Sequence, residues 1–152
     1  MLARDWFDKL RGDVLDVASM EENVARLRGS VGPSGAASGS GGVRGGDGCP
    51  VCDRLIDAEL ELEQAKASLK PDLDRACAVL YGLDGRGGIA RVRGSAAADS
   101  IHGYYLQGMS WPEVAVSLVR HCGKNGAHWC RMTAARALEY ADTVGMETLM
   151  HL

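Results

Sequence analysis

A glycine- and serine-rich stretch over residues 29–48 constrains the fold of this chain more than any other feature. Its apolar surface is too small to offset the chain entropy that folding would cost, so we expect a flexible linker there. A second glycine-rich segment, residues 82–94, predicts a flexible loop. Because the chain has only 152 residues, it should hold one modest core, and a second full domain is not expected.

The segments on either side of the first linker have the apolar periodicity of amphipathic helices. In residues 1–28 the apolar stripe comprises Phe7, Leu10, Val14, Val17 and Val24. In residues 49–81 it comprises Leu55, Ala58, Leu62, Ala65 and Leu69. The second segment also contains Pro71, which is expected to kink or restart its helix. We therefore predict two long helices that pair as an antiparallel hairpin, or as coiled-coil-like helices between two copies of the chain.

Two shorter helices are expected after the second glycine-rich segment. Ser95 is a candidate cap for the first, which should end at Gly108. The next four-residue signal, Ser110-Trp111-Pro112-Glu113, matches a capping box with proline in the first turn, so a second helix should start there. The short apolar and basic run Ile89–Arg93 before them is ambiguous between loop and strand.

The chain then repeats the alternation of turn and helix once more. A turn is expected over residues 123–126, a helix over 127–142, and a tail over 143–152 that forms one further turn or docks a partner. A capped short helix, a turn and a longer last helix are the parts of a helix-turn-helix. The predicted fold is thus all-α, with an N-terminal helical hairpin or coiled-coil-like helices followed by a three-helix helix-turn-helix domain over residues 95–142.

Local charge indicates a partner for this last region. The whole chain has a formal net charge of −3, but the segment from Ala115 to Leu138 carries four basic residues and no acid. Such an excess suits contact with phosphates, and side chains at the start of the last helix suit base edges. The candidate DNA-binding residues are Arg120, Lys124, Asn125, His128, Trp129, Arg131 and Arg136. Two alternatives stay open: Trp129 packs in the core instead, or the basic residues are only the solvated face of packed helices.

A family resemblance supports the DNA-binding hypothesis. Residues 104–115, YYLQGMSWPEVA, resemble the signature R-Y-x-x-G-x-S-W-x-E-I-A of small phage transcriptional regulators of the RinA/ArpU type, which are similar to region four of sigma factors. The segment from Cys130 to Leu138 resembles the family's recognition helix, and the match covers roughly residues 53–142. The resemblance implies a helical N-terminal region and a helix-turn-helix that reads DNA, encoded on a prophage or mobile element. The turn before the last helix is longer here than in the family.

Other chemistries are less well supported by the sequence. Cys49 and Cys52 have the spacing of a zinc knuckle, and Cys122 and His128 are candidates to complete a tetrahedral site, so a small zinc-binding module is an alternative. Cys130 fits better as a small inward-facing apolar residue. No nucleophile, histidine and carboxylate form a recognisable catalytic pattern, so we expect neither an enzyme nor a cofactor.

The expected partners follow from these patterns. Double-stranded DNA comes first, RNA polymerase and a second copy bound through the N-terminal helices are further candidates, and a helical interaction protein that does not bind DNA is the alternative function. The start of the sequence lacks a secretory signal, no apolar run is long enough for a bilayer, and the five cysteines are odd in number. We therefore expect a cytoplasmic protein with reduced thiols and no membrane association.

Overall fold

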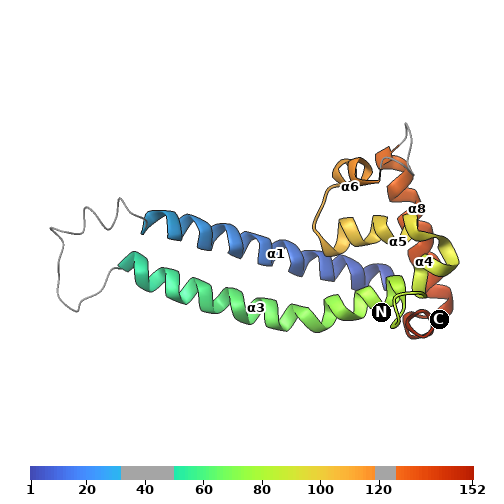
Figure 1. The fold of residues 1–152 in the computed structure, drawn as a ribbon, viewed down its shortest axis with the longest axis horizontal. Coiled ribbons are helices and arrows are strands. Elements are labelled where there is room, and N and C mark those ends of the chain that lie inside the picture. The colour runs from blue at the N-terminus through green and yellow to red at the C-terminus, as the bar shows by residue number, and fades with distance from the viewer. Residues whose placement is uncertain (32–49, 119–125) are drawn as a thin grey trace. The chain divides into compact units, whose positions relative to one another are not determined.

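The computed structural model describes residues 1–31, 50–118 and 126–152, and these residues are almost entirely helical (Figure 1). No strand occurs among them, which confirms the predicted all-α class. The elements in chain order are α1 (Ala3–Ser30), α3 (Pro50–Tyr81), α4 (Gly88–Arg93), α5 (Ser95–Ile101), η2 (His102–Leu106, a π-helical turn), α6 (Trp111–Ser117), α8 (Gly126–Val144) and α9 (Met146–Met150). The predicted linker lies outside the described residues except for its first three positions, two of which belong to α1.

The described chain divides into two compact units. One comprises Met1–Leu15 together with Leu69–Leu152, and the other comprises Asp16–Ser68. The long helices α1 and α3 therefore each contribute to both units. The first unit is larger than the domain predicted over residues 95–142, because it also takes in the start of α1, the end of α3 and the short helices α4 and α9.

In the unit formed by Asp16–Ser68, the second part of α1 and the first part of α3 pack antiparallel (Figure 1). Arg28 pairs with Glu59 at 3.0 Å, and Glu21 pairs with Lys66 at 3.4 Å. Moving back along α1 from the first pair to the second moves the same number of residues forward along α3, which is the register of antiparallel helices. These exposed ion pairs each add little stability. Burial of apolar residues such as Val24 contributes more to this unit.

Pro71 does not interrupt α3, which runs as one helix from Pro50 to Tyr81. A proline inside a helix removes one backbone hydrogen bond and normally favours a kink or a break. The neighbouring Leu69 is only 7% exposed, and Ala76, Val79 and Leu80 farther along the helix are fully buried. Burial of these residues on both sides of the proline offsets its local cost, so the expectation of a restarted helix was wrong.

The core of the unit formed by Met1–Leu15 and Leu69–Leu152 is shared among its helices. Its largest fully buried side chains come from nearly every element and include Phe7, Leu80, Ile89, Ile101, Leu138 and Leu149. α5 packs against α4 and α8, and α9 packs back on α8. The last of these contacts buries Leu149, and the Leu83 N–H donates to the Met150 carbonyl at 3.0 Å. The predicted tail over residues 143–152 therefore contains one further helical turn that belongs to the core.

The glycine-rich segment 82–94 is packed and partly helical, so the prediction of a flexible loop, with a strand as an option, was wrong. Gly82, Gly87 and Gly88 are close to other backbone atoms, and the Gly87 N–H donates to the Tyr81 carbonyl at 2.7 Å. From Gly88 the chain forms α4, which buries Ile89 completely. Here glycine allows backbones to approach closely, whereas the sequence pattern had suggested a flexible segment.

The start of α5 also differs from expectation. Its N-cap is Gly94, with φ of +96°, and no side chain caps the helix, so Ser95 is the first helical residue and not the predicted cap. The helix continues into η2 after Ile101 and ends before Gly108, whose φ of +70° suits glycine. The predicted end of this helical stretch at Gly108 is therefore correct to within two residues.

Candidate nucleic-acid interface

The start of α6 has the capping geometry that the sequence predicts. The Glu113 N–H donates to the Ser110 hydroxyl at 3.4 Å, and the Ser110 N–H donates to the Glu113 carboxylate at 3.3 Å. Each bond satisfies a backbone donor that the first helical turn leaves unpaired. The predicted capping box is confirmed, and it determines where α6 begins relative to the preceding turn.

α6 packs against α8 through a small apolar cluster. Val114 and Cys130 are completely buried at its centre, which confirms the inward position expected for Cys130. Partly buried side chains surround this pair: Tyr104, Met109, Trp111, Ala115, Leu118 and Trp129. The alternative reading of Trp129 as a core residue is thus the one that its packing favours. The cluster holds α6 across α8.

The glycine at position 103 belongs to the same packing. A side-chain β-carbon there would lie 3.1 Å from a methyl group of Val114 and 3.5 Å from the sulfur of Met109. Because Val114 is fully buried, it has little room to shift. A larger side chain at position 103 would therefore press on Val114 of α6.

The exposed residues near the start of α8 include basic side chains and no acid. The buried residues of α8 are Cys130, Ala134, Ala137, Leu138 and Ala141. Arg131, Met132 and Arg136 lie outside this buried set, as does His128, and no acid occurs in α8 before Glu139. The first three turns of this helix therefore offer three basic or titratable side chains to solvent, all of which the sequence singled out.

Some predicted site residues cannot be placed. Arg120, Lys124 and Asn125 lie outside the described residues, as do Cys49 and Cys122 of the alternative zinc site. Of the remaining zinc candidates, Cys52 and His128 are both at least partly accessible. The described parts of the chain contain no cluster of three His, Cys, Asp or Glu side chains suited to a metal ion.

An aromatic stack joins η2 to the start of α6, and an arginine of α1 lies on it. The rings of Tyr104 and Trp111 are parallel to within 6°, with centroids 4.0 Å apart. On Tyr104 lies the guanidinium of Arg11, 3.7 Å from the ring centroid, and this group also donates to the carbonyls of Tyr104 and, at 3.0 Å, Met109. Arg11 thus connects α1 to η2 and the turn after it by cation–π contact and by charged hydrogen bonds.

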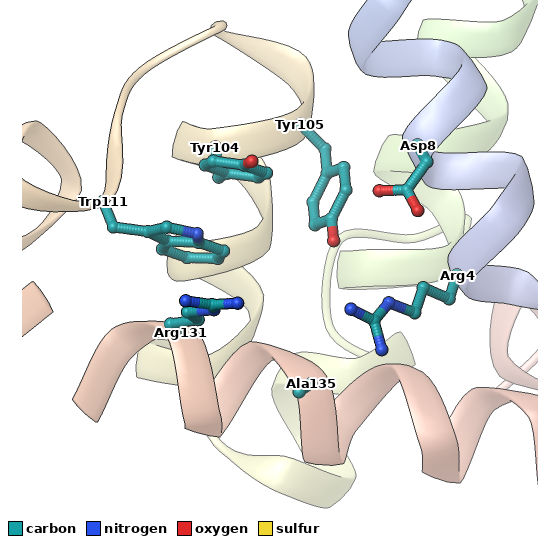
Figure 2. Close-up of a pocket in the computed structure, with 7 residues that line it drawn as sticks. All are labelled: Arg4, Asp8, Tyr104, Tyr105, Trp111, Arg131 and Ala135. Atoms are coloured by element: carbon teal, nitrogen blue, oxygen red, sulfur yellow. The ribbon is translucent and has the colours of Figure 1, made fainter. Parts of the chain in front are cut away.

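Beside this stack lies a half-open hollow of about 290 Å³ (Figure 2). Arg4 and Asp8 enter it from α1, Arg131 and Ala135 from α8, and the rings of Tyr104, Tyr105 and Trp111 form its remaining wall. Burial, followed by the nearby Asp8 carboxylate, raises the pKa of Tyr105 to about 12, so its hydroxyl stays protonated at neutral pH. Arg4 and Tyr105 were not predicted from the sequence, because they are far apart along the chain.

A second basic hollow of about 240 Å³ lies on α8. Arg136 shares it with Arg93 of α4, together with Val92, Ala97 and Thr133. The Arg93 guanidinium also lies 5.6 Å from the centroid of the Tyr140 ring. Sequence reasoning missed Arg93 because it treated residues 82–94 as a loop. The available signal was the presence of two arginines among the apolar residues over 89–93.

Comparison with known proteins gives no relative: no family model, no curated protein and no solved structure matches this chain. Among the described helices, none combines the length and the apolar character that crossing a membrane requires.

Proposed function

We propose that this protein is a double-stranded DNA-binding transcriptional regulator that reads the major groove with α8. The observation that supports this most directly is the acid-free start of α8, where His128, Arg131 and Arg136 are exposed and the capped helix α6 packs against the buried Cys130. In helix-turn-helix proteins the second helix of the motif enters the major groove, and the first crosses the backbone. α6 and α8 are suited to these two roles.

The dimensions and chemistry of α8 suit this role. A helix of 19 residues is about 28 Å long, and an α-helix fits the major groove. Arg131 and Arg136 present planar guanidinium groups, which bind phosphates or the guanine edge with two hydrogen bonds. His128, one turn before Arg131 and exposed, is available for the first base contacts. Because the whole chain is acidic, attraction to DNA must come from this local surface.

The test is fluorescence-anisotropy binding of the full chain to a pool of labelled duplexes, including the DNA upstream of its own coding sequence, at low and at physiological salt. We expect one duplex to keep tight binding as salt rises. The double variant Arg131→Ala/Arg136→Ala should weaken binding and lower the slope of log affinity against log salt by about 2, roughly one per lost phosphate contact.

A charge-matched control separates local contact from net charge. Lys9→Ala/Arg54→Ala removes two positive charges from exposed positions on α1 and α3, and neither residue forms an ion pair with another described residue. This control should bind like the unmodified chain, and circular dichroism should show both variants folded. If no duplex binds at either salt, or if the two double variants lose the same affinity, the DNA-binding proposal is wrong.

A protein-binding function is the second candidate, and one observation favours it. Ile56 and Leu60, one turn apart on α3, are 56% and 57% exposed. An apolar pair on a helix face is suited to contact with another helical chain, either RNA polymerase or a second copy. Analytical ultracentrifugation of the full chain and of Ile56→Ser/Leu60→Ser tests self-association. A monomer at all concentrations would leave only a different partner for this face.

A further inference from the structure

The hollow beside the aromatic stack brings together two guanidinium groups that have no carboxylate partner. Arg4 and Arg131 reach it from different helices, and neither forms an ion pair with any described residue. A guanidinium that forms no ion pair favours an anion that accepts two parallel hydrogen bonds, which means a carboxylate or a phosphate. In Figure 2 the Tyr105 hydroxyl points into the space between the two guanidiniums, where it adds a third donor.

The remaining wall of the hollow is aromatic. The Trp111 ring is stacked on Tyr104 and is only partly buried, and in Figure 2 it lies between Tyr104 and the Arg131 guanidinium with its edge toward the hollow. An aromatic edge of this kind contacts a planar ring in the edge-to-face arrangement. Asp8 contributes the carboxylate of the hollow, and it suits an amino group on such a ring. With two positive charges and one negative, the side chains favour a ligand with net negative charge.

We propose that this hollow binds a small aromatic anion, a planar ring that carries a carboxylate or phosphate and an amino group. Arg4 and Arg131 bind the anionic group, Trp111 contacts the ring, and Asp8 accepts from the amine. A concave site lined by rings and a few converging polar groups is the usual form of a small-molecule site. The volume of about 290 Å³ limits the ligand to roughly one ring system and one charged group.

Ligand binding has a consequence that rests on the proposed function. Arg131 lies in this hollow and is also one of the two arginines assigned to DNA. A carboxylate or phosphate that occupies its guanidinium withdraws it from the DNA backbone. The ligand therefore acts as an effector that weakens DNA binding, and by linkage DNA weakens binding of the ligand by the same factor.

Isothermal titration calorimetry on the full chain tests the site without DNA. The two probes are adenosine monophosphate, which carries a phosphate, and 2-aminobenzoate, which carries a carboxylate; adenosine and inorganic phosphate serve as fragments that lack the anion or the ring. We expect at least one aromatic anion to bind at least about tenfold more tightly than both fragments, since a charged hydrogen bond contributes about 1.5 to 3 kcal/mol and about 1.4 kcal/mol is tenfold. The probe that binds identifies the anionic group.

Variants on α1 identify the residues responsible. Arg4→Gln removes one guanidinium from an exposed position and should weaken the bound probe by about tenfold or more, whereas Lys9→Gln, an exposed cation of the same helix outside the hollow, should leave it unchanged. Circular dichroism checks that both variants are folded. The proposal is overturned if neither aromatic anion binds at about 10 mM, about tenfold above a weak millimolar affinity. Equal binding by Arg4→Gln, or by phosphate alone, would also overturn it.

The effect of the ligand on DNA binding is measured in a separate experiment. When the bound probe is added to a preformed complex with duplex DNA, we expect anisotropy to fall for the unmodified chain and to stay unchanged for Arg4→Gln. If the chain binds no duplex, the proposed function fails while calorimetry still decides whether the hollow is a site. If the probe binds by calorimetry but leaves DNA affinity unchanged, the effector role is wrong.

Discussion

At the scale of single residues, the glycines from the end of α3 to the first residue of α4 differ in what surrounds them. Gly88 has a φ of +65°, and a β-carbon there would lie 2.5 Å from the Val79 carbonyl oxygen, whereas Gly85, with φ of +77°, has open space around it. Gly88→Ala should therefore combine about 1 to 2 kcal/mol of left-handed strain with about 1 to 3 kcal/mol of overpacking. Gly85→Ala should show only the strain. Urea unfolding measures both, and equal losses would mean that the packed turn adjusts freely.

His102, the first residue of η2, gives the stability of the fold a pH dependence. Burial lowers the pKa of His102 below its usual 6.5, and the nearby Asp99 only partly offsets this effect. The unfolded chain binds this proton more readily than the folded chain does. The contribution of neutral His102 to the free energy of unfolding is therefore fully present above pH 6.5 and is lost as pH falls below that value. The free energy of unfolding should thus decrease as pH falls from about 8 to about 5.5. His102→Gln should reduce that decrease; an identical pH profile in the variant would contradict the assignment.

At the scale of elements, the start of α6 tests how much a cap contributes. Ser110→Ala removes the side-chain acceptor of the capping box and should cost about 1 kcal/mol of stability. Ser95→Ala is the matched control, because Ser95 occupies the first position of α5 and forms no cap bond there. It should change stability by no more than a few tenths of a kcal/mol. Thermal unfolding distinguishes the two, and a similar loss in both would show that the cap bonds do not stabilise α6.

The elements also show which features of this fold can be predicted from local sequence. Helix periodicity and the capping box at Ser110 depend on residues a few positions apart, so the long helices and the start of α6 were predictable. α4 was missed because its six residues are too few to show a helical period and because the glycines before it are held by contacts distant in sequence. Gly87 illustrates the reason, since a β-carbon there would lie 2.4 Å from the carbonyl carbon of Leu152, a contact with the other end of the chain. Such a constraint comes from tertiary packing alone.

At the scale of the whole molecule, the candidate site likewise combines residues that the sequence singled out with residues that it missed. His128, Arg131 and Arg136 were found because they lie within one acid-free run of the sequence. Arg4, Arg11 and Arg93 were not found, since their place depends on how α1 and α4 fold against residues 102–144. Pairs such as Arg11 and Tyr104 are joined by the fold, and no single-sequence pattern spans that separation.

One compact unit of this protein is built from two distant stretches of chain, and this has a testable consequence. Met1–Leu15 packs with Leu69–Leu152, and Phe7 is completely buried there, with its ring centroid 5.6 Å from that of Tyr105. A fragment of residues 69–152 retains α6 and α8 but lacks Phe7 and the Arg11 contacts. We expect this fragment to keep helical circular dichroism but to lose cooperative unfolding. The reason is that the buried ring of Phe7 and the hydrogen bonds of Arg11, both from α1, are missing.

Point variants in the full chain show whether Phe7 is the cause. Phe7→Ala should cost about 3 to 5 kcal/mol by leaving a cavity, while Phe7→Leu keeps most of the apolar volume and should cost less than about 1.5 kcal/mol. If the fragment 69–152 unfolds as cooperatively as the full chain, the start of α1 is dispensable for the core. If it does not, the proposed DNA-binding helices depend on a segment at the opposite end of the sequence, and any fragment meant to bind DNA must include that segment.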